Sequence, residues 1–222
     1  MLKLDEMEED ALKELFNLSL GRAASTLSEM VDAEVSISVP CLDWAAPKEV
    51  AKHLGSLAGA SVGLVAMPYR FEFSSEEILP GMAVLLMRYQ DVGHFLDLLY
   101  GTPIPADMVD QVEVEAMEQV GDVLLYTCTS SLSAFLQSDI DSDPPRYLKG
   151  EPQSLLDHLP LTKTEESDLA TTPDPEAQLL TLRVDFAIVE KEVTGSIMTW
   201  MDGRCVKGMV AELDHLIDDH CP

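Results

Sequence analysis

The sequence predicts an α+β fold in which two similar halves form one roughly six-stranded sheet with two long helices packed on it. Residues 6–31 and 108–137 both space their apolar side chains as amphipathic helices do. Each long segment is followed by the same order of elements: a strand, a short helix, two strands and a helix. A duplication explains this order most simply, so we expect a single domain over 1–222 with repeats at 1–104 and 105–222.

The first helix, at 6–31, has two contrasting faces. Its core face is defined by apolar residues three or four positions apart, namely Leu12, Phe16, Leu20, Ala23, Leu27 and Met30. On the opposite side, Asp10, Glu14, Asn17 and Gly21 lie along one line of the helix. A carboxylate and an amide one turn apart, beside a glycine that lets another molecule approach, are what a docking or catalytic face needs. On spacing alone, a solvated helix face is the favoured interpretation of this line.

The rest of the first half predicts a sheet segment. Residues 33–39 alternate apolar and polar side chains, which is typical of a half-buried strand, and Pro40 ends it. A short helix is expected at 47–54 because Pro47 is tolerated at a helix start. The remaining elements of this half are expected to be strands at 55–73 and 82–89, joined by an acidic loop at 74–77, and a helix at 91–100 that ends before Gly101.

The second half predicts the same elements with one longer connection. After the helix at 108–137, an extended piece is expected at 139–147. An acidic stretch rich in Ser, Thr and Pro at about 161–177 is typical of a mobile loop. The other elements are expected at 152–158 for a short helix, 179–189 and 193–201 for strands, and 204–219 for the closing helix.

Composition restricts the partners. Forty acidic residues against fourteen basic ones give a net charge of −26, which disfavours nucleic acid and anionic membranes. The four cysteines lack C-x-x-C spacing, as free thiols of a reducing cytoplasm do. The first residues are acidic where a signal peptide would be apolar, and no segment is long and apolar enough for membrane insertion. We therefore expect a soluble cytoplasmic protein.

No metal site is expected from the sequence. The histidines and cysteine nearest to one another are His215, His220 and Cys221, at the end of the chain. Their spacing is typical of a frayed helix end rather than of a ligand set.

The polar line of the first helix carries a recognisable motif. An Asp or Ser, three residues, a Glu, two residues, an Asn and a Pro about two dozen residues later are found here as Asp10, Glu14, Asn17 and Pro40. With the Gly-x-Ala-Ala continuation from Gly21, this pattern resembles the CheC/CheX family of chemotaxis phosphatases. The resemblance extends over essentially the whole chain, because the duplicated layout is also the family's. It implies a CheC-like fold.

The resemblance implies hydrolysis of the aspartyl phosphate of a CheY-like response regulator, in chemotaxis or two-component signalling. Glu14 would pair with a lysine of the receiver domain, and Asn17 would orient the attacking water. Asp10, Gly21 and Pro40 would contribute to partner binding, with Pro40 shaping the rim of the site. For Asp10, the alternative role is support of the helix start. An amide suits the water-positioning role because it donates and accepts hydrogen bonds without carrying charge.

The resemblance also bears on cofactors and partners. The protein needs no cofactor of its own, because the required Mg²⁺ would be held by the receiver domain. The deamidase CheD is a second candidate partner. The alternative function is a non-catalytic scaffold or adaptor, since the fold also resembles the middle domain of flagellar switch proteins. Those proteins usually carry a further carboxy-terminal β-rich module, and the chain ends at Pro222 without room for it, which favours the phosphatase.

The second half is expected to carry a degenerate copy of the motif. We match the halves at a spacing of 104 residues through Glu14 and Glu118, Asn17 and Gly121, and Pro40 and Pro144. In this register Val114 replaces Asp10, and Gly121 has no side chain to hold a water. The second site, formed by Val114, Glu118, Gly121 and Pro144, is therefore expected to lack the family chemistry.

Overall fold

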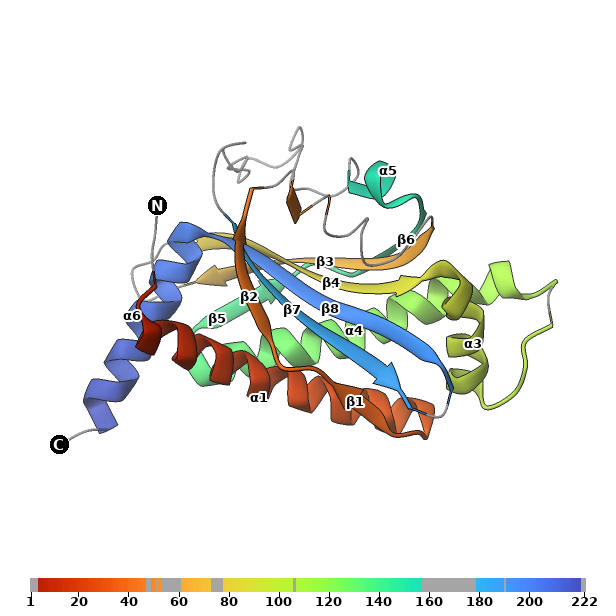
Figure 1. Ribbon diagram of the computed structural model, residues 1–222, viewed down its shortest axis with the longest axis horizontal. Helices are drawn as coiled ribbons and strands as arrows, with labels where there is room; N and C mark the ends of the chain where they lie inside the picture. Colours follow the sequence, from red (N-terminus) through yellow and green to blue (C-terminus); the bar gives the residue numbers. More distant parts are fainter. Residues whose placement is uncertain are drawn as a thin grey trace.

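One antiparallel sheet with helices on both faces forms the protein (Figure 1). The computed structural model describes residues 4–46, 49–50, 52, 61–72, 78–105, 107–156, 179–189 and 191–220. In chain order the elements are α1 (Glu6–Val31), β1 (Val35–Ile37), β2 (Cys41–Ala45), β3 (Val62–Glu72), β4 (Ile78–Arg88), α3 (Tyr89–Tyr100), α4 (Val109–Leu136), β5 (Asp139–Ser142), β6 (Arg146–Gly150), α5 (Pro152–Leu156), β7 (Leu179–Ile188), β8 (Val193–Asp202) and α6 (Gly203–His220).

The predicted α+β fold class is confirmed, with a different number of strands. The described part of the sheet has eight strands in the order β1-β7-β8-β4-β3-β5, with β2 also on β7 and β6 also on β3. The strand expected at 33–39 is reduced to β1, and after Pro40 the chain forms β2, which we did not predict. The strand expected at 139–147 is divided into β5 and β6, because Pro144 and Pro145 interrupt the ladder between them. The strand we predicted at 82–89 begins at Ile78 instead. Its Pro80 is tolerated because pairing with β8 begins only at Gly81, so no ladder hydrogen bond is lost on that side.

The helices agree closely with the prediction. α1 has the expected bounds, α4 begins one residue later than expected, and Gly101 caps α3 in a left-handed conformation. Of the short helix expected at 47–54, residues 49, 50 and 52 are described, and all three are helical. The acidic segments expected at 74–77 and 161–177 lie outside the described residues.

The sheet has an apolar core on each face. α1 and α4 lie side by side beneath it and cover the larger core, with α3 and α6 at its two ends (Figure 1). A smaller core, which includes Trp200 and Leu155 of α5, lies on the opposite face. Burial of apolar surface on both faces stabilises the sheet and fixes the backbone of α1 and α4, leaving their outer faces in solvent.

The two halves exchange their outer strands. β1 and β2 of the first half pair with β7 of the second half, and β5 and β6 of the second half pair with β3 of the first. β4 and β8 pair at the centre. Each half therefore completes the sheet of the other, which the order of elements along the chain does not reveal.

Candidate functional site

The polar line of α1 is exposed, as predicted. Asp10, Glu14 and Asn17 are exposed and Gly21 is half-buried, whereas the apolar stripe on the other side is buried or packed against the core. Within the described residues, the side chains of Glu14 and Asn17 make no hydrogen bond or ion pair. One helical turn separates them, a rise of about 4.5 Å along the axis. Both groups are therefore available to a partner.

A capping box fixes the start of α1. Asp5 Oδ1 accepts the N–H groups of Met7 at 2.9 Å and Glu8 at 2.8 Å, and Glu8 Oε2 accepts the Asp5 N–H at 2.6 Å. Asp10 lies more than one turn inside the helix. The capping role considered for Asp10 therefore belongs to Asp5, and the carboxylate of Asp10 points to solvent.

The structure brings the segment around Pro40 close to this helix. Pro40 is buried between β1 and β2, and Cys41 directly after it is exposed. The pKa of Lys13 is raised by its ion pair with Glu9, 2.6 Å away, with smaller contributions from Asp10 and Cys41. Cys41 thus lies within electrostatic range of the helix turn that bears Asp10. Sequence positions some thirty residues apart meet at one surface.

Burial and helix caps relate α4 to α1 by 105 residues, not 104. Every buried position of α1 has a buried counterpart 105 positions later: Leu12 and Met117, Leu15 and Val120, Phe16 and Gly121, Ser19 and Leu124, Leu20 and Leu125, Ala23 and Cys128, Ala24 and Thr129, Leu27 and Leu132, Val31 and Leu136. The left-handed C-caps, Asp32 and Gln137, have the same separation. Our predicted register was wrong by one residue.

The turns between the split strands give the same register independently. The Ser38 N–H donates to the Asp185 carbonyl at 2.8 Å, and the Asp143 N–H donates to the Pro68 carbonyl at 2.9 Å. Ser38 and Asp143 are again 105 residues apart, and each begins the turn that joins a pair of outer strands. In this register the counterpart of Pro40 is Pro145 rather than Pro144.

The residues predicted to form the degenerate second site do not lie on one surface. Gly121 is buried, and a Cβ there would collide with the Val65 side chain. Glu118 Oε1 accepts the Tyr147 N–H at 3.2 Å, so this carboxylate holds the edge of β6. Val114 and Pro144 are exposed. Neighbouring residues of a helix point in directions about 100° apart, so a register that is wrong by one residue can match an exposed position of α1 with a buried position of α4.

The true counterparts of the motif are exposed on α4. Asp10, Glu14, Asn17 and Gly21 correspond in turn to Glu115, Gln119, Asp122 and Tyr126, all of which are exposed. Sequence reasoning missed these four residues. The signal that could have found them was the apolar stripe of the second helix, which aligns with that of the first only at a spacing of 105.

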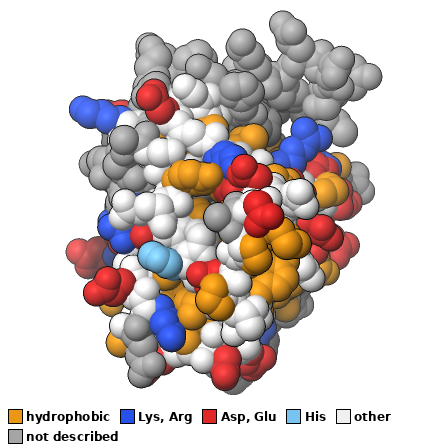
Figure 2. Space-filling model, turned by 90° about the vertical axis from the view of Figure 1, so that its right-hand side faces the viewer, with side chains coloured by type: hydrophobic (Ala, Val, Ile, Leu, Met, Phe, Trp, Pro, Cys, Tyr) orange, Lys and Arg blue, Asp and Glu red, His pale blue; other side chains and the backbone are white. Residues whose placement is uncertain are grey.

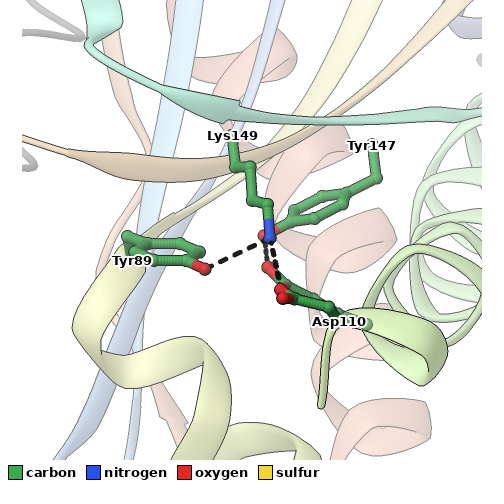
Figure 3. Close-up of polar contacts among 5 residues, drawn as sticks. Tyr89, Asp110, Tyr147 and Lys149 are labelled. Carbon is green, nitrogen blue, oxygen red and sulfur yellow. Dashed lines mark hydrogen bonds and ion pairs between the residues drawn. The ribbon is translucent and has the colours of Figure 1, made fainter. Parts of the chain in front are cut away.

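An ionic cluster around the buried Glu113 holds the start of α4 against the sheet (Figure 3). Glu113, with 1% of its side chain exposed, accepts hydrogen bonds from the Tyr147 hydroxyl at 2.5 Å and the Lys149 ammonium at 2.9 Å. Lys149 also reaches Asp110 at 3.1 Å and the Tyr89 hydroxyl at 3.2 Å. The hydrogen bond to Glu113 raises the pKa of Lys149, and burial followed by the Glu113 bond raises that of Tyr147. Both carboxylate oxygens of the buried Glu113 are paired, which is typical of a structural cluster.

A cavity lies apart from the motif residues in the described part of the chain. A cavity of about 520 Å³ opens on the far face of the sheet, lined by residues of β1, β4, β7 and β8, and none of the motif residues borders it. In the described part of the chain, no group of three or more His, Cys, Asp or Glu side chains is placed to hold a metal ion. Among the described helices, none combines the length and apolar content that a bilayer span requires.

The end of the molecule formed by α3 and the start of α4 mixes apolar and charged side chains (Figure 2). Tyr89, Tyr100, Met108 and Val114 are its exposed large hydrophobic residues. Charged side chains lie between them, so this end does not form one continuous apolar patch.

Comparison with known proteins identifies the stretch that carries the motif. The model of the CheC-like family matches residues 7–42, which contain the whole motif from Asp10 to Pro40. The flagellar motor switch phosphatase FliY of Bacillus subtilis (strain 168) is 25% identical over 214 residues, or 95% of this chain and 50% of FliY. The resemblance to the CheC/CheX family is confirmed. The chain spans about half the length of this curated relative.

Solved structures share the fold of this chain. FliY of Thermotoga maritima aligns with a TM-score of 0.69 and 20% identity, over 96% of this chain and 99% of that structure. The middle domain of FliM from H. pylori aligns with a TM-score of 0.58 and 9% identity, over 94% and 99% of the two chains. These structural likenesses show a shared fold.

Proposed function

We propose that this protein hydrolyses the aspartyl phosphate of a CheY-like receiver domain through the outer face of α1. One observation carries the proposal. Glu14 and Asn17 are exposed, unpaired within the described residues and one turn apart, inside the stretch that matches the CheC-like family. The relative FliY is named a phosphatase, which supports the same reaction.

The proposed chemistry divides the work between the two side chains. Asn17 orients a water in line with the bond between phosphorus and the receiver's aspartate oxygen. The water oxygen bonds to phosphorus, the aspartate leaves as a carboxylate, and the water protons go to the released phosphate and to solvent. Positioning is the main requirement, because an acyl phosphate is already activated. Glu14 pairs with a lysine of the receiver and holds the two proteins in register.

An exposed helix face is suited to this substrate. The phosphoryl group lies on the surface of a folded receiver domain, so the catalyst must project into the receiver's own site rather than enclose a small molecule. Mg²⁺ bound by the receiver neutralises phosphoryl charge. The cavity on the far face of the sheet has no part in this reaction.

The test follows loss of radioactive phosphate from a labelled CheY-like receiver domain. We expect the wild-type protein to accelerate the loss, and Asn17→Ala to lower the rate by about 10²-fold, as removal of a positioned catalytic donor does. Glu14→Ala should act mainly through the receiver concentration needed for half-maximal rate. Ser25→Ala is the matched control, because Ser25 is exposed on the same helix beyond the motif.

Two results would contradict the proposal in different ways. Unchanged phosphate loss with wild-type protein, across several cognate receivers, would refute the enzyme assignment. Rapid loss that survives Asn17→Ala would refute the residue assignment and leave the reaction itself standing.

The second candidate is a non-catalytic scaffold that binds a receiver domain or CheD. The observation that favours it is the fold shared with the FliM middle domain, because the same framework occurs there in a switch protein. A scaffold requires binding without turnover. Receiver or CheD binding by isothermal titration, together with unchanged phosphate loss, would favour this candidate over the phosphatase.

A further inference from the structure

The polar line of α1 has a flank on the side of α4. Leu18 directly follows Asn17, and Arg22 directly follows Gly21, so both side chains are rotated from the line by about 100° in the same direction. Both are exposed, and Leu18 keeps 46% of its surface accessible. A partner that covers Asn17 therefore meets this flank as well.

Contacts with α4 hold the Arg22 side chain in place. Its guanidinium carbon lies 5.2 Å from the centre of the Phe135 ring, and Nη1 donates a hydrogen bond to Ser131 Oγ at 3.5 Å. Stacking on an aromatic ring orients a guanidinium without neutralising its charge. Because α1 and α4 lie side by side, these contacts cross the line where the two helices meet (Figure 1). We call Leu18, Arg22 and Phe135 the seam patch.

Arg22 places an unpaired positive charge on an acidic helix. The basic residues of α1 are Lys13 and Arg22, against six acidic residues, and the whole chain has a net charge of −26. Lys13 is paired with Glu9 at 2.6 Å, whereas Arg22 makes no ion pair within the described residues. Next to the motif, Arg22 is therefore the group best suited to attract an anionic partner.

A receiver domain that holds Mg²⁺ presents anionic groups of this kind. Mg²⁺ in such sites is bound by carboxylates and phosphate oxygens, so carboxylates surround the phosphoryl group. Arg22 lies five residues beyond Asn17, or about 7.5 Å along the helix axis. When Asn17 faces the phosphoryl group, Arg22 therefore faces the rim of the receiver's site. The planar guanidinium matches a carboxylate with two parallel hydrogen bonds.

We propose that the seam patch binds the receiver domain, with the Arg22 guanidinium on a receiver carboxylate and Leu18 on apolar surface beside it. The identity of the partner rests on the proposed function of α1. Arg22 acts here in binding and not in the chemical step, which Asn17 serves. A receiver that lacks an acidic side chain at this place binds weakly, so the patch selects among receivers.

The first test measures phosphate loss at increasing concentrations of the labelled receiver domain. We expect Arg22→Gln to raise KM about tenfold and to change kcat less than about twofold, because the contact contributes equally to the ground and transition states. The ratio of the variant KM to the wild-type KM should shrink at high salt, since ions screen exposed charges. Lys207→Gln is the matched control, because it removes the same charge from an exposed position on α6.

Further variants separate binding from support of the fold. If Arg22 only clamps α1 to α4, Arg22→Gln will lower the Tm and leave KM unchanged, which would overturn the inference. Leu18→Ala should raise KM with little change in Tm, because this side chain is exposed. Phe135→Leu keeps the charge but frees the guanidinium, so we expect KM to rise by about two- to fivefold. Circular dichroism melting verifies that each variant folds.

The second test is independent of hydrolysis. Isothermal titration measures binding of the unphosphorylated receiver domain, and Arg22→Gln should weaken this binding about tenfold as well. A rise in KM without weaker binding of the unphosphorylated receiver would place the guanidinium on the phosphoryl group and overturn the carboxylate assignment.

The two tests together separate the inference from the proposed function. Hydrolysis by wild type, with KM and binding both unchanged in folded Arg22→Gln, overturns the inference alone. Receiver binding that Arg22→Gln weakens, without hydrolysis by wild type, supports the inference and overturns the proposed function. Neither binding nor hydrolysis by wild type overturns both.

Discussion

The chemistry proposed for α1 depends on a difference of one group between two similar side chains. Asn17 carries an amide, and Asp122, in the equivalent position of α4, carries a carboxylate of almost the same shape. The amide can accept a hydrogen bond from water and donate one to a phosphoryl oxygen, whereas the carboxylate can only accept. The same position therefore carries a neutral donor and acceptor on α1 and a negatively charged acceptor on α4.

Asn17→Asp isolates this difference. We expect it to reduce receiver dephosphorylation about as strongly as Asn17→Ala, near 10²-fold, because the added charge opposes the phosphoryl group. The measurement is single-turnover phosphate loss beside thermal melting. The Tm should change little, since Asn17 is exposed and unpaired in the described residues. Retained activity in Asn17→Asp would show that charge at this position is unimportant.

The glycines Gly21 and Gly121 predict opposite effects of one substitution. Gly21→Ala should raise the free energy of unfolding by about 0.5–1 kcal/mol, because alanine favours the helix and a Cβ meets no atom within 4 Å. Gly121→Ala should lower it by about 1–3 kcal/mol, because the new methyl collides with Val65 on β3. Urea unfolding of both variants tests the pair. Equal changes would contradict the assignment of Gly21 to the outer face and Gly121 to the core.

At the scale of elements, α4 is anchored by the Glu113 cluster, and this gives a stability prediction. Tyr147→Phe removes the donor to Glu113 Oε1 and leaves a buried carboxylate oxygen unpaired, so we expect a loss of about 1–3 kcal/mol. Urea unfolding measures it. Tyr126→Phe is the control, because Tyr126 is exposed and its hydroxyl has no partner among the described residues. Equal stability of Tyr147→Phe and wild type would argue against the cluster as an anchor.

The turn between β5 and β6 predicts a pH dependence. Arg70 donates to Asp143 at 2.7 and 3.1 Å, and this hydrogen bonding lowers the pKa of Asp143. A lowered folded-state pKa stabilises the fold above the unfolded pKa, about 3.9, and the contribution is lost as pH falls through the folded value. Because Asp143 is 46% exposed, at most about 1 kcal/mol is expected. The stability difference between wild type and Asp143→Asn should therefore shrink as pH falls below about 4, and a constant difference would contradict the pairing.

The sequence predicted the helices well and the register of the halves poorly, for physical reasons. α1 has a clear 3.6-residue period and an acidic start, which local side-chain interactions determine. We matched Glu14 with Glu118 because the two residues are identical, but equivalent surface positions need not carry the same residue. Even equivalent core positions can differ in size. Phe16 of α1 corresponds to Gly121 of α4, where the Val65 side chain lies too close for any larger residue.

The sheet shows a second limit of sequence reasoning. Alternation at 33–39 predicted a strand, and Pro40 its end, but the resumption of pairing at Cys41 depends on β7, far along the chain. The polar line of α1 was predicted in full because one helix determines it. The match between α1 and α4 depends on which residues are buried in the folded protein. The closeness of Cys41 to Lys13 likewise depends on tertiary structure, so a local sequence pattern predicts neither.

For the whole molecule, the exchange of outer strands predicts that neither half folds alone. A chain of residues 1–104 would leave β1 and β2 without β7 and β4 without β8. We expect it to lack cooperative unfolding as a monomer, and mixing it with a chain of residues 105–222 to restore a cooperative transition. Circular dichroism melting with size-exclusion chromatography measures both. A cooperatively unfolding monomer of 1–104 would contradict the prediction.

The same exchange determines when the candidate site is complete during synthesis. α1 and the turn at Pro40 leave the ribosome early, but Val35 pairs with Ile188, which follows on the order of ten seconds later at ordinary elongation rates. Until then β1 lacks its partner strand β7, and an unpaired outer strand is exposed to other chains. The segment that carries Glu14 and Asn17 is thus one of the first parts of the chain to be synthesised and one of the last to reach its folded surroundings.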